Sequence, residues 1–196
     1  MKNIRPLVAA LATSALLASA APTLAQQAMG HMMNNGSNPM VGNHAMSSSK
    51  DIVSNAVTSD DNTILVAAVK AAGLVQTLQG KGPFTVFAPT DEAFKLLPAG
   101  TVDTLVKPEN KATLTNILTY HVVAGRLDFA ALSNLIAAGK GKASLKTVQG
   151  ETLTVEANGP RNIVLVDAKG NIAQISTYDV YQSNGVIHVI DKVLAP

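Results

Sequence analysis

The sequence contains no cysteine and no tryptophan, and aromatic residues are scarce, with four Phe and three Tyr among 196 residues. The absence of cysteine excludes a disulfide scaffold, a thiol nucleophile, a thiolate metal site and a lipid-modified cysteine. Charged residues are also few, at 14%, whereas hydrophobic residues make up 47% and exclude a fully disordered chain. A chain of this length is expected to form one domain, with or without a tail.

The N-terminal 25 residues have the layout of a secretory signal peptide. Lys2 and Arg5 precede an apolar run from residue 7 to residue 17, and small residues follow up to Ala25. The apolar run is too short to cross a bilayer, which disfavours a membrane anchor. We therefore expect a signal peptide at residues 1–25, cut after Ala25 or, as the second candidate, after Ala20. The protein is then secreted or periplasmic, with no transmembrane segment in the mature chain.

The excess of positive charge disappears with this segment. The whole chain has 15 Lys and Arg against 13 Asp and Glu, and removing Lys2 and Arg5 leaves 13 of each sign. Binding to nucleic acid needs a basic stripe, often with stacking aromatic residues, and the sequence shows neither. Lys140, Lys142 and Lys146 come closest to a basic cluster, and we expect them on a solvated loop. Nucleic acid is therefore not an expected partner.

Residues 26–50 differ in composition from the rest of the mature chain. They contain no acidic or aromatic residue and, apart from methionine, a single sizeable apolar side chain, Val41. Such a segment cannot bury enough surface to offset its ordering entropy, so we expect a flexible leader here and a folded domain at residues 51–196. The leader concentrates thioether and imidazole groups, which suit Cu(I) or Ag(I). Soft-metal capture is thus an alternative function, with these candidate ligands: Met29, His31, Met32, Met33, Met40, His44 and Met46.

The apolar spacing from residue 51 onward predicts a series of helices in the first half of the domain. Asp60, Asp61 or Asn62 is expected to cap the second of them, and Thr90 or Asp91 the fourth. The expected helices are 52–57, 64–72, 74–78, 91–97, 101–106, 108–118 and 127–138.

Strand-like segments at 84–88 and 120–123 interrupt the helices, and after Gly139 the pattern changes to strands separated by turns. Asn158-Gly159 and Asn184-Gly185 are hairpin signals between these strands. Helices followed by antiparallel hairpins predict the α+β class rather than alternating α/β.

Three separated segments carry a resemblance to a known family. They are GPFTVFAPTDEAF (Gly82 to Phe94), LTYHVVAG (Leu118 to Gly125) and NGVIHVIDKVLAP (Asn184 to Pro196). In order and spacing they resemble the conserved segments of the fasciclin domain, as found in small secreted bacterial proteins with one such domain. The resemblance implies a wedge of two angled β-sheets flanked by a group of helices. It also implies non-catalytic adhesion or extracellular protein interaction, with an extracellular protein or an envelope or matrix component as partner.

The Tyr120–His121 pair has two interpretations. In the family, such a pair has been proposed as part of an adhesion surface, which makes Tyr120 and His121 candidate interaction residues. Alternatively, both side chains belong to the core, with the hydroxyl and the imidazole satisfied internally, and the apolar Val122 and Val123 after them favour this reading. His188 alternates with apolar residues in its strand and is expected to be buried and bonded to backbone.

Motifs for catalysis are missing from the sequence. It shows no Gly-x-Ser-x-Gly elbow, no phosphate-cradling glycine loop and no His-Glu-x-x-His pair, so we expect a protein that is not an enzyme and needs no cofactor. Asp91 and Glu92 are adjacent, but neighbours at a helix start point in different directions and complement the helix dipole. Binding of a small molecule or lipid in a groove of the domain remains a further alternative. Because a single domain adheres weakly, weak homo-oligomerisation is also considered.

Overall fold

The computed structural model describes residues 38–159 and 161–196, and the predicted signal peptide lies outside them. From residue 51 onward, helices and strands follow one another in the expected order, helices mostly first and hairpins last. The helices are α2 (Ile52–Ala56), α3 (Thr63–Ala72), α4 (Val75–Leu78), α5 (Asp91–Lys95), α6 (Thr101–Leu105), η1 (Pro108–Asn110, a 3₁₀ turn), α7 (Lys111–Tyr120) and α8 (Phe129–Ala138). The strands are β1 (Met40–Val41), β2 (His44–Ala45), β3 (Phe84–Pro89), β4 (Val122–Ala124), β5 (Lys142–Lys146), β6 (Thr152–Ala157), β7 (Ile163–Val166), β8 (Ile172–Gln182) and β9 (Gly185–Ile190).

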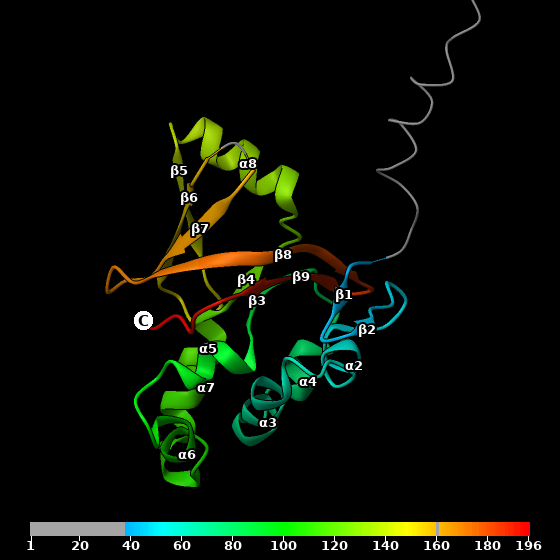
Figure 1. Ribbon diagram of the computed structural model, residues 1–196, viewed down its shortest axis with the longest axis vertical. Coiled ribbons are helices and arrows are strands. Elements are labelled where there is room, and N and C mark those ends of the chain that lie inside the picture. The colour runs from blue at the N-terminus through cyan, green and yellow to red at the C-terminus, as the bar shows by residue number, and fades with distance from the viewer. Residues whose placement is uncertain (1–37, 160) are drawn as a thin grey trace, which may run out of the picture. The chain divides into compact units, whose positions relative to one another are not determined.

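The larger sheet of the described residues has the strand order β4-β3-β9-β8-β7-β6-β5. The long strand β8 divides it in two, because its first residues pair with β7 and its later residues pair with β9, with register shifts between Ile175 and Val180. Figure 1 shows β5, β6 and β7 rising from β8 at an angle to β9. This arrangement confirms the predicted α+β class with two angled sheets.

The centre of the fold contains a parallel strand pair that the sequence pattern did not indicate. Strand β3 runs parallel to β9, with Phe84 opposite Gly185 and Pro89 opposite Ile190, whereas the other strand pairs are antiparallel. Parallel strands are usually buried on both faces. All six residues of β9 are buried, in agreement with this rule.

Two hydrophobic cores lie on the two faces of this central pair. On one face, Val86 and Ile187 pack with helices α2 to α5 and α7. On the other face, Phe87 and Ile190 pack with α8 and strands β5 to β7. Side chains alternate between the two faces along each strand, so β3 and β9 each contribute residues to both cores. Figure 1 shows α8 beside β5–β7 and the other helices below β3 and β9.

Helix α7 extends further than the sequence pattern predicted. Residues 120–123 were expected to form a strand, but the helix includes Tyr120, and His121 caps it in the right-handed helical region. The hydroxyls of Thr115 and Thr119 donate hydrogen bonds to carbonyls four residues earlier, so these β-branched residues are accommodated within the helix. The strand that follows begins at Val122.

Residues 38–46, here called the strap, pack against the domain. Residues 26–50 were expected to form a flexible leader, and the structure corrects this expectation for the strap. The strap forms the hairpin β1–β2, and its Val41 and Met46 are each only 7% exposed within the helical core. Gly42 has a positive φ of +57°, and a Cβ there would lie 2.6 Å from the backbone nitrogens of Asp60 and Asp61. Two buried apolar side chains, one close backbone contact and hydrogen bonds between the Asn38 side chain and the Tyr181 backbone therefore hold a segment whose overall composition is polar.

The strap allows a direct stability test with two methionines. Met46 is buried and Met40 is 63% exposed, so Met46→Ala should lower the free energy of unfolding by about 2–4 kcal/mol and Met40→Ala by less than about 0.5 kcal/mol. Urea unfolding followed by circular dichroism measures both. Equal effects of the two substitutions would show that the strap is not packed.

Candidate functional site

The side chain of Tyr120 lies entirely in the interior, with no exposed surface. Its hydroxyl donates a hydrogen bond to the carbonyl of Thr152 at 3.0 Å and accepts one from the amide of Ala168 at 3.1 Å. Burial raises the pKa of the Tyr120 hydroxyl, which therefore remains protonated. The phenol thus connects the end of α7 to β6 and to the turn between β7 and β8.

His121 is 2% exposed and its ring makes two hydrogen bonds to backbone. The amide of Leu194 donates to Nε2 at 3.0 Å, so the proton of the neutral ring must lie on Nδ1, which donates to the carbonyl of Ile117 at 2.7 Å. A second proton on Nε2 would face the Leu194 amide. Burial lowers the pKa of His121 to about 4, so the ring is neutral at pH 7.

The geometry therefore places both members of the Tyr120–His121 pair inside the domain. Neither side chain can contact a partner while the domain is folded, and the polar atoms of both are hydrogen-bonded inside the domain. His188 shows the same behaviour with the opposite tautomer, because its Nδ1 accepts from the amide of Asp179 at 3.3 Å and its Nε2 donates to the carbonyl of Leu127 at 2.8 Å. The predicted backbone bonding of His188 is confirmed.

The two buried histidines make stability depend on pH. Their pKa values are lowered in the folded state, so the unfolded chain binds more protons below pH 6.5 and stability falls as the pH falls toward about 4. For His121 alone the loss is about 3 kcal/mol. Urea unfolding between pH 7 and pH 4 should show a smaller pH-dependent loss for His121→Gln than for the wild type.

His44 supplies a control for the effect of a histidine-to-glutamine substitution itself. Its side chain is 48% exposed and lies 3.1 Å from the Asp60 carboxylate, so His44→Gln should change the free energy of unfolding at pH 7 by less than about 0.5 kcal/mol. If His121→Gln retains the full pH dependence, the buried His121 is not its cause.

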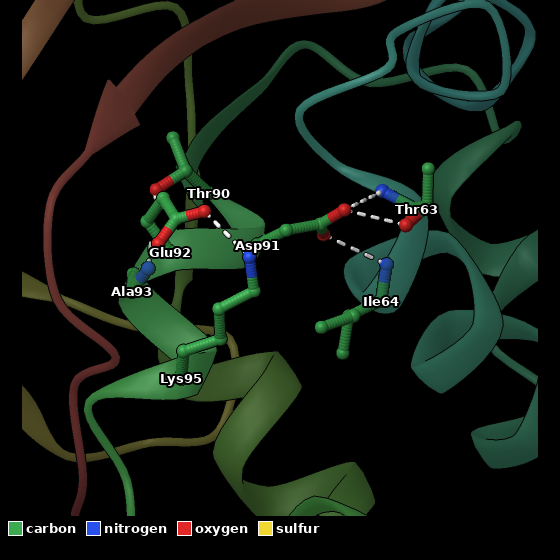
Figure 2. Close-up of polar contacts among 7 residues, drawn as sticks. All are labelled: Thr63, Ile64, Thr90, Asp91, Glu92, Ala93 and Lys95. Atoms are coloured by element: carbon green, nitrogen blue, oxygen red, sulfur yellow. Dashed lines mark hydrogen bonds and ion pairs between the residues drawn. The ribbon is translucent and has the colours of Figure 1, made fainter.

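A second polar cluster joins α5 to α3 on the helical side of the domain (Figure 2). The carboxylate of Asp91 accepts hydrogen bonds from the amide of Thr63 at 3.2 Å, from the hydroxyl of Thr63, and from the amide of Ile64 at 2.9 Å. In return, the amide of Asp91 donates to the carbonyl of Asp61 at 2.7 Å. Asp91 thus caps the N-terminus of α3 from another helix and fixes α5 in place.

Sequence reasoning missed this cap because it lies far along the chain. Asn62 occupies the N-cap position of α3, but its buried amide group donates to the carbonyl of Pro89 at 3.0 Å and accepts from the Ser59 hydroxyl at 3.0 Å instead. The expected cap of α5 by Thr90 is confirmed, with its hydroxyl accepting from the amide of Ala93 at 3.2 Å. Because Thr90 caps α5, the carboxylate of the next residue, Asp91, is available to cap α3.

The outer side of α5 carries exposed groups of both signs and an apolar side chain. Glu92 and Lys95 form an ion pair at 2.6 Å, and their side chains are 80% and 63% exposed. Figure 2 shows Asp91 pointing toward α3, while Glu92 and Lys95 lie away from it. Leu96, the residue after this helix, is 69% exposed, the largest value among the exposed large hydrophobic residues of the described chain. We call Glu92, Lys95 and Leu96 the α5 surface.

The interhelical cap gives a further stability prediction. Asp91→Ala removes an acceptor from the first turn of α3 and should lower the free energy of unfolding by about 1–2 kcal/mol. Glu92→Ala, at the next position, removes a largely exposed carboxylate and should change it by less than about 0.5 kcal/mol. Urea denaturation of the two variants separates these values, and a Glu92→Ala effect as large as that of Asp91→Ala would contradict the cap.

Three of the candidate metal ligands lie within the described residues, and the structure places them in different environments. Met46 is enclosed in the core, Met40 is exposed, and His44 contacts Asp60. Met29, His31, Met32 and Met33 lie outside the described residues. Within residues 38–159 and 161–196, no group of three or more His, Asp or Glu side chains could hold a metal ion.

An apolar cavity of about 50 Å³ lies beneath the strap. Its walls include Val41 and Met46 of the strap, Leu65 of α3, Val86 of β3 and Ile187 of β9. A cavity that binds benzene is about 150 Å³, so this one is too small for a drug-sized ligand or a lipid without rearrangement. Its size does not favour the hypothesis of small-molecule binding.

The comparisons with known proteins agree with the fold and with the motif segments. The family model described as the Fasciclin domain matches residues 60–196. Protein sll1483 of Synechocystis sp. is 43% identical over 169 residues, covering 86% of each chain. Immunogenic protein MPB70 of Mycobacterium bovis is 39% identical over 149 residues, covering 72% of this chain and 68% of that protein. The chain therefore belongs to the fasciclin domain family.

Two animal proteins share only a part of their length with this chain. Transforming growth factor-beta-induced protein ig-h3 of Sus scrofa is 38% identical over 142 residues, which are 71% of this chain and 19% of that protein. A solved FAS1 domain pair from the insect cell adhesion molecule Fasciclin I superposes with a TM-score of 0.66 at 18% identity, covering 75% of this chain and 51% of the other. At that identity the superposition shows the fold alone.

No helix within the described part of the chain is both long enough and apolar enough to span a membrane.

Proposed function

We propose that this protein is a non-catalytic adhesion or extracellular protein-interaction domain and that its partner binds the α5 surface. Membership of the fasciclin family supports the class of function. Relatives include a protein described as cell surface glycolipoprotein MPB83 of Mycobacterium bovis, 39% identical over 123 residues that cover 63% of this chain and 48% of that protein, and the fold is that of an insect cell adhesion molecule. The partner is a protein or another component of the envelope or matrix.

We choose this surface because Leu96 is exposed at the end of α5, a helix that is held in place by hydrogen bonds to α3. Protein interfaces are built around exposed apolar side chains surrounded by polar groups, and Glu92 and Lys95 supply such groups nearby. Asp91 fixes α5 against α3, so little conformational entropy is lost when a partner binds. Tyr120 and His121 are buried and therefore do not supply this surface, so they act on adhesion through the fold.

The α5 surface can be tested with two matched leucines. Leu96 and Leu135 are both exposed leucines at helical segments, at 69% and 41% exposure, and Leu135 lies on α8 in the other half of the domain. Beads coated with the purified domain are counted on intact cells of the producing organism. Leu96→Lys should lower bead binding about tenfold, the effect of a modest hot spot, whereas Leu135→Lys should bind like the wild type.

Circular dichroism and thermal unfolding must show that both variants are folded. Equal binding of the two folded variants would remove the α5 surface from the proposal. A wild-type domain that binds no cells and no matrix material would remove adhesion itself. Sedimentation equilibrium of the free domain separates weak self-association from binding to a different partner.

The location of the protein is part of the same proposal. The first 25 residues support export to the periplasm or beyond, with cleavage after Ala25 and Ala20 as the second candidate site. Intact-mass measurement of the protein recovered from cell envelope and medium identifies the mature N-terminus. A chain recovered only with residues 1–25 attached would contradict export by this signal.

A further inference from the structure

Three Asn-Gly pairs occur in the sequence, and the structure gives two of them opposite environments. The pairs are Asn35-Gly36, outside the described residues, Asn158-Gly159 and Asn184-Gly185. In such a pair, the backbone nitrogen of the glycine can attack the side-chain amide carbon of the asparagine. Glycine favours the attack because it has no side chain to obstruct it and because its backbone is free to rotate. Asparagine is accordingly among the thermolabile residues of proteins.

Asn158 and Gly159 lie exposed in the loop between β6 and β7. Gly159 has a φ of +93°, and a Cβ added there would meet no heavy atom within 4 Å outside the two adjacent residues, so the space beside this glycine is open. The backbone amide of Asn158 donates to the carbonyl of Asn162 at 2.8 Å, which fixes the base of the loop. Among described residues, the Asn158 side chain has no hydrogen-bond partner.

Asn184 and Gly185 show how the same dipeptide is protected. The Asn184 side chain accepts from the amide of Ile52 at 3.0 Å and donates to the carbonyls of Leu78 and Gly80 at 2.7 and 3.1 Å. Gly185 is buried in β9, and a Cβ there would lie 2.1 Å from the Phe84 carbonyl oxygen. The side chain is held in place by three hydrogen bonds, and the glycine backbone is fixed in the sheet opposite Phe84.

We propose that Asn158 is a site of spontaneous covalent modification, with solvent water as the reactant. The nitrogen of Gly159 loses its proton to solvent base and bonds to Cγ of Asn158, and the side-chain nitrogen leaves as ammonia. The product is a five-membered succinimide. Water then adds to one of its two carbonyl carbons and breaks that carbon's bond to the ring nitrogen. Opening at one carbonyl gives aspartate, and opening at the other gives isoaspartate, in which the chain continues through the side-chain carbon.

The modified residue changes both the charge and the shape of this end of the sheet. The amide of Ala157 donates to the carbonyl of Gly141 at 3.1 Å, and Glu156 lies opposite Lys142 in the pairing of β6 with β5. The loop therefore lies beside the start of β5. A new carboxylate at Asn158 adds a negative charge at the end of the sheet where β5 begins with the exposed Lys142. Isoaspartate also adds a methylene group to the backbone within the hairpin loop.

The experiment ages the purified full chain in mildly alkaline buffer and follows two tryptic peptides by mass spectrometry. Residues 147–161 contain Asn158, and residues 170–192 contain Asn184. Asn158 should gain the mass of an amide-to-acid exchange at least about tenfold faster than Asn184, since the second pair reacts only after the sheet opens locally. The Asn158 product should appear as two chromatographic species, aspartate and isoaspartate.

Two controls keep the proposal testable. Asn158→Ser should abolish the change in peptide 147–161, and fragment ions distinguish Asn158 from Gln149 in the same peptide. In urea, where both pairs are unfolded, Asn184 should react at a rate close to that of Asn158. Equal rates in the folded chain, or an Asn158 that stays intact while the unfolded chain reacts, would overturn the proposal.

Discussion

The fold depends on a parallel pair of strands, β3 and β9, that is buried on both faces. Because each face is covered by a separate core, every polar group that enters this region must find a partner inside the protein. All buried side-chain nitrogen and oxygen atoms of the described residues have one. The positions of the buried side chains of His121, His188, Tyr120 and Asn62 follow from this requirement, since each bonds to a backbone carbonyl group.

The segment containing Tyr120 and His121 shows that the residues of a sequence motif can stabilise the fold without contacting a partner. The two side chains bond to β6, to the β7–β8 turn and to Leu194, close to the C-terminus. Asp167 binds the same tail through the amide of Ala195 at 3.1 Å. Burial opposes ionisation of Asp167, but hydrogen bonds from Asn171, Ala195 and Lys169 together lower its pKa. Loss of adhesion on substituting Tyr120 or His121 would therefore be expected from destabilisation of the fold, without any direct contact between these side chains and a partner.

Local patterns in the sequence predicted the elements well and their long-range connections poorly. The alternation around His188 predicted its burial among apolar residues, because strand geometry fixes this locally. The cap of α3 by Asp91 and the parallel pairing of β3 with β9 depend on residues distant in sequence, which periodicity cannot detect. The strap was missed for a related reason: its order comes from Val41 and Met46, two residues in a polar segment. The exposure of Leu96 likewise needed the packed structure.

The separation in sequence of the contacting strands also governs when this chain can fold. Phe84 pairs with Gly185, and Asn38 bonds through its side chain to the backbone of Tyr181, with its Oδ1 accepting from the Tyr181 amide at 2.9 Å. The pairing of β3 with β9 therefore cannot form until residues 185–190 have been synthesised and have left the ribosome, whereas the β5–β6 hairpin joins neighbouring residues and does not have to wait for them.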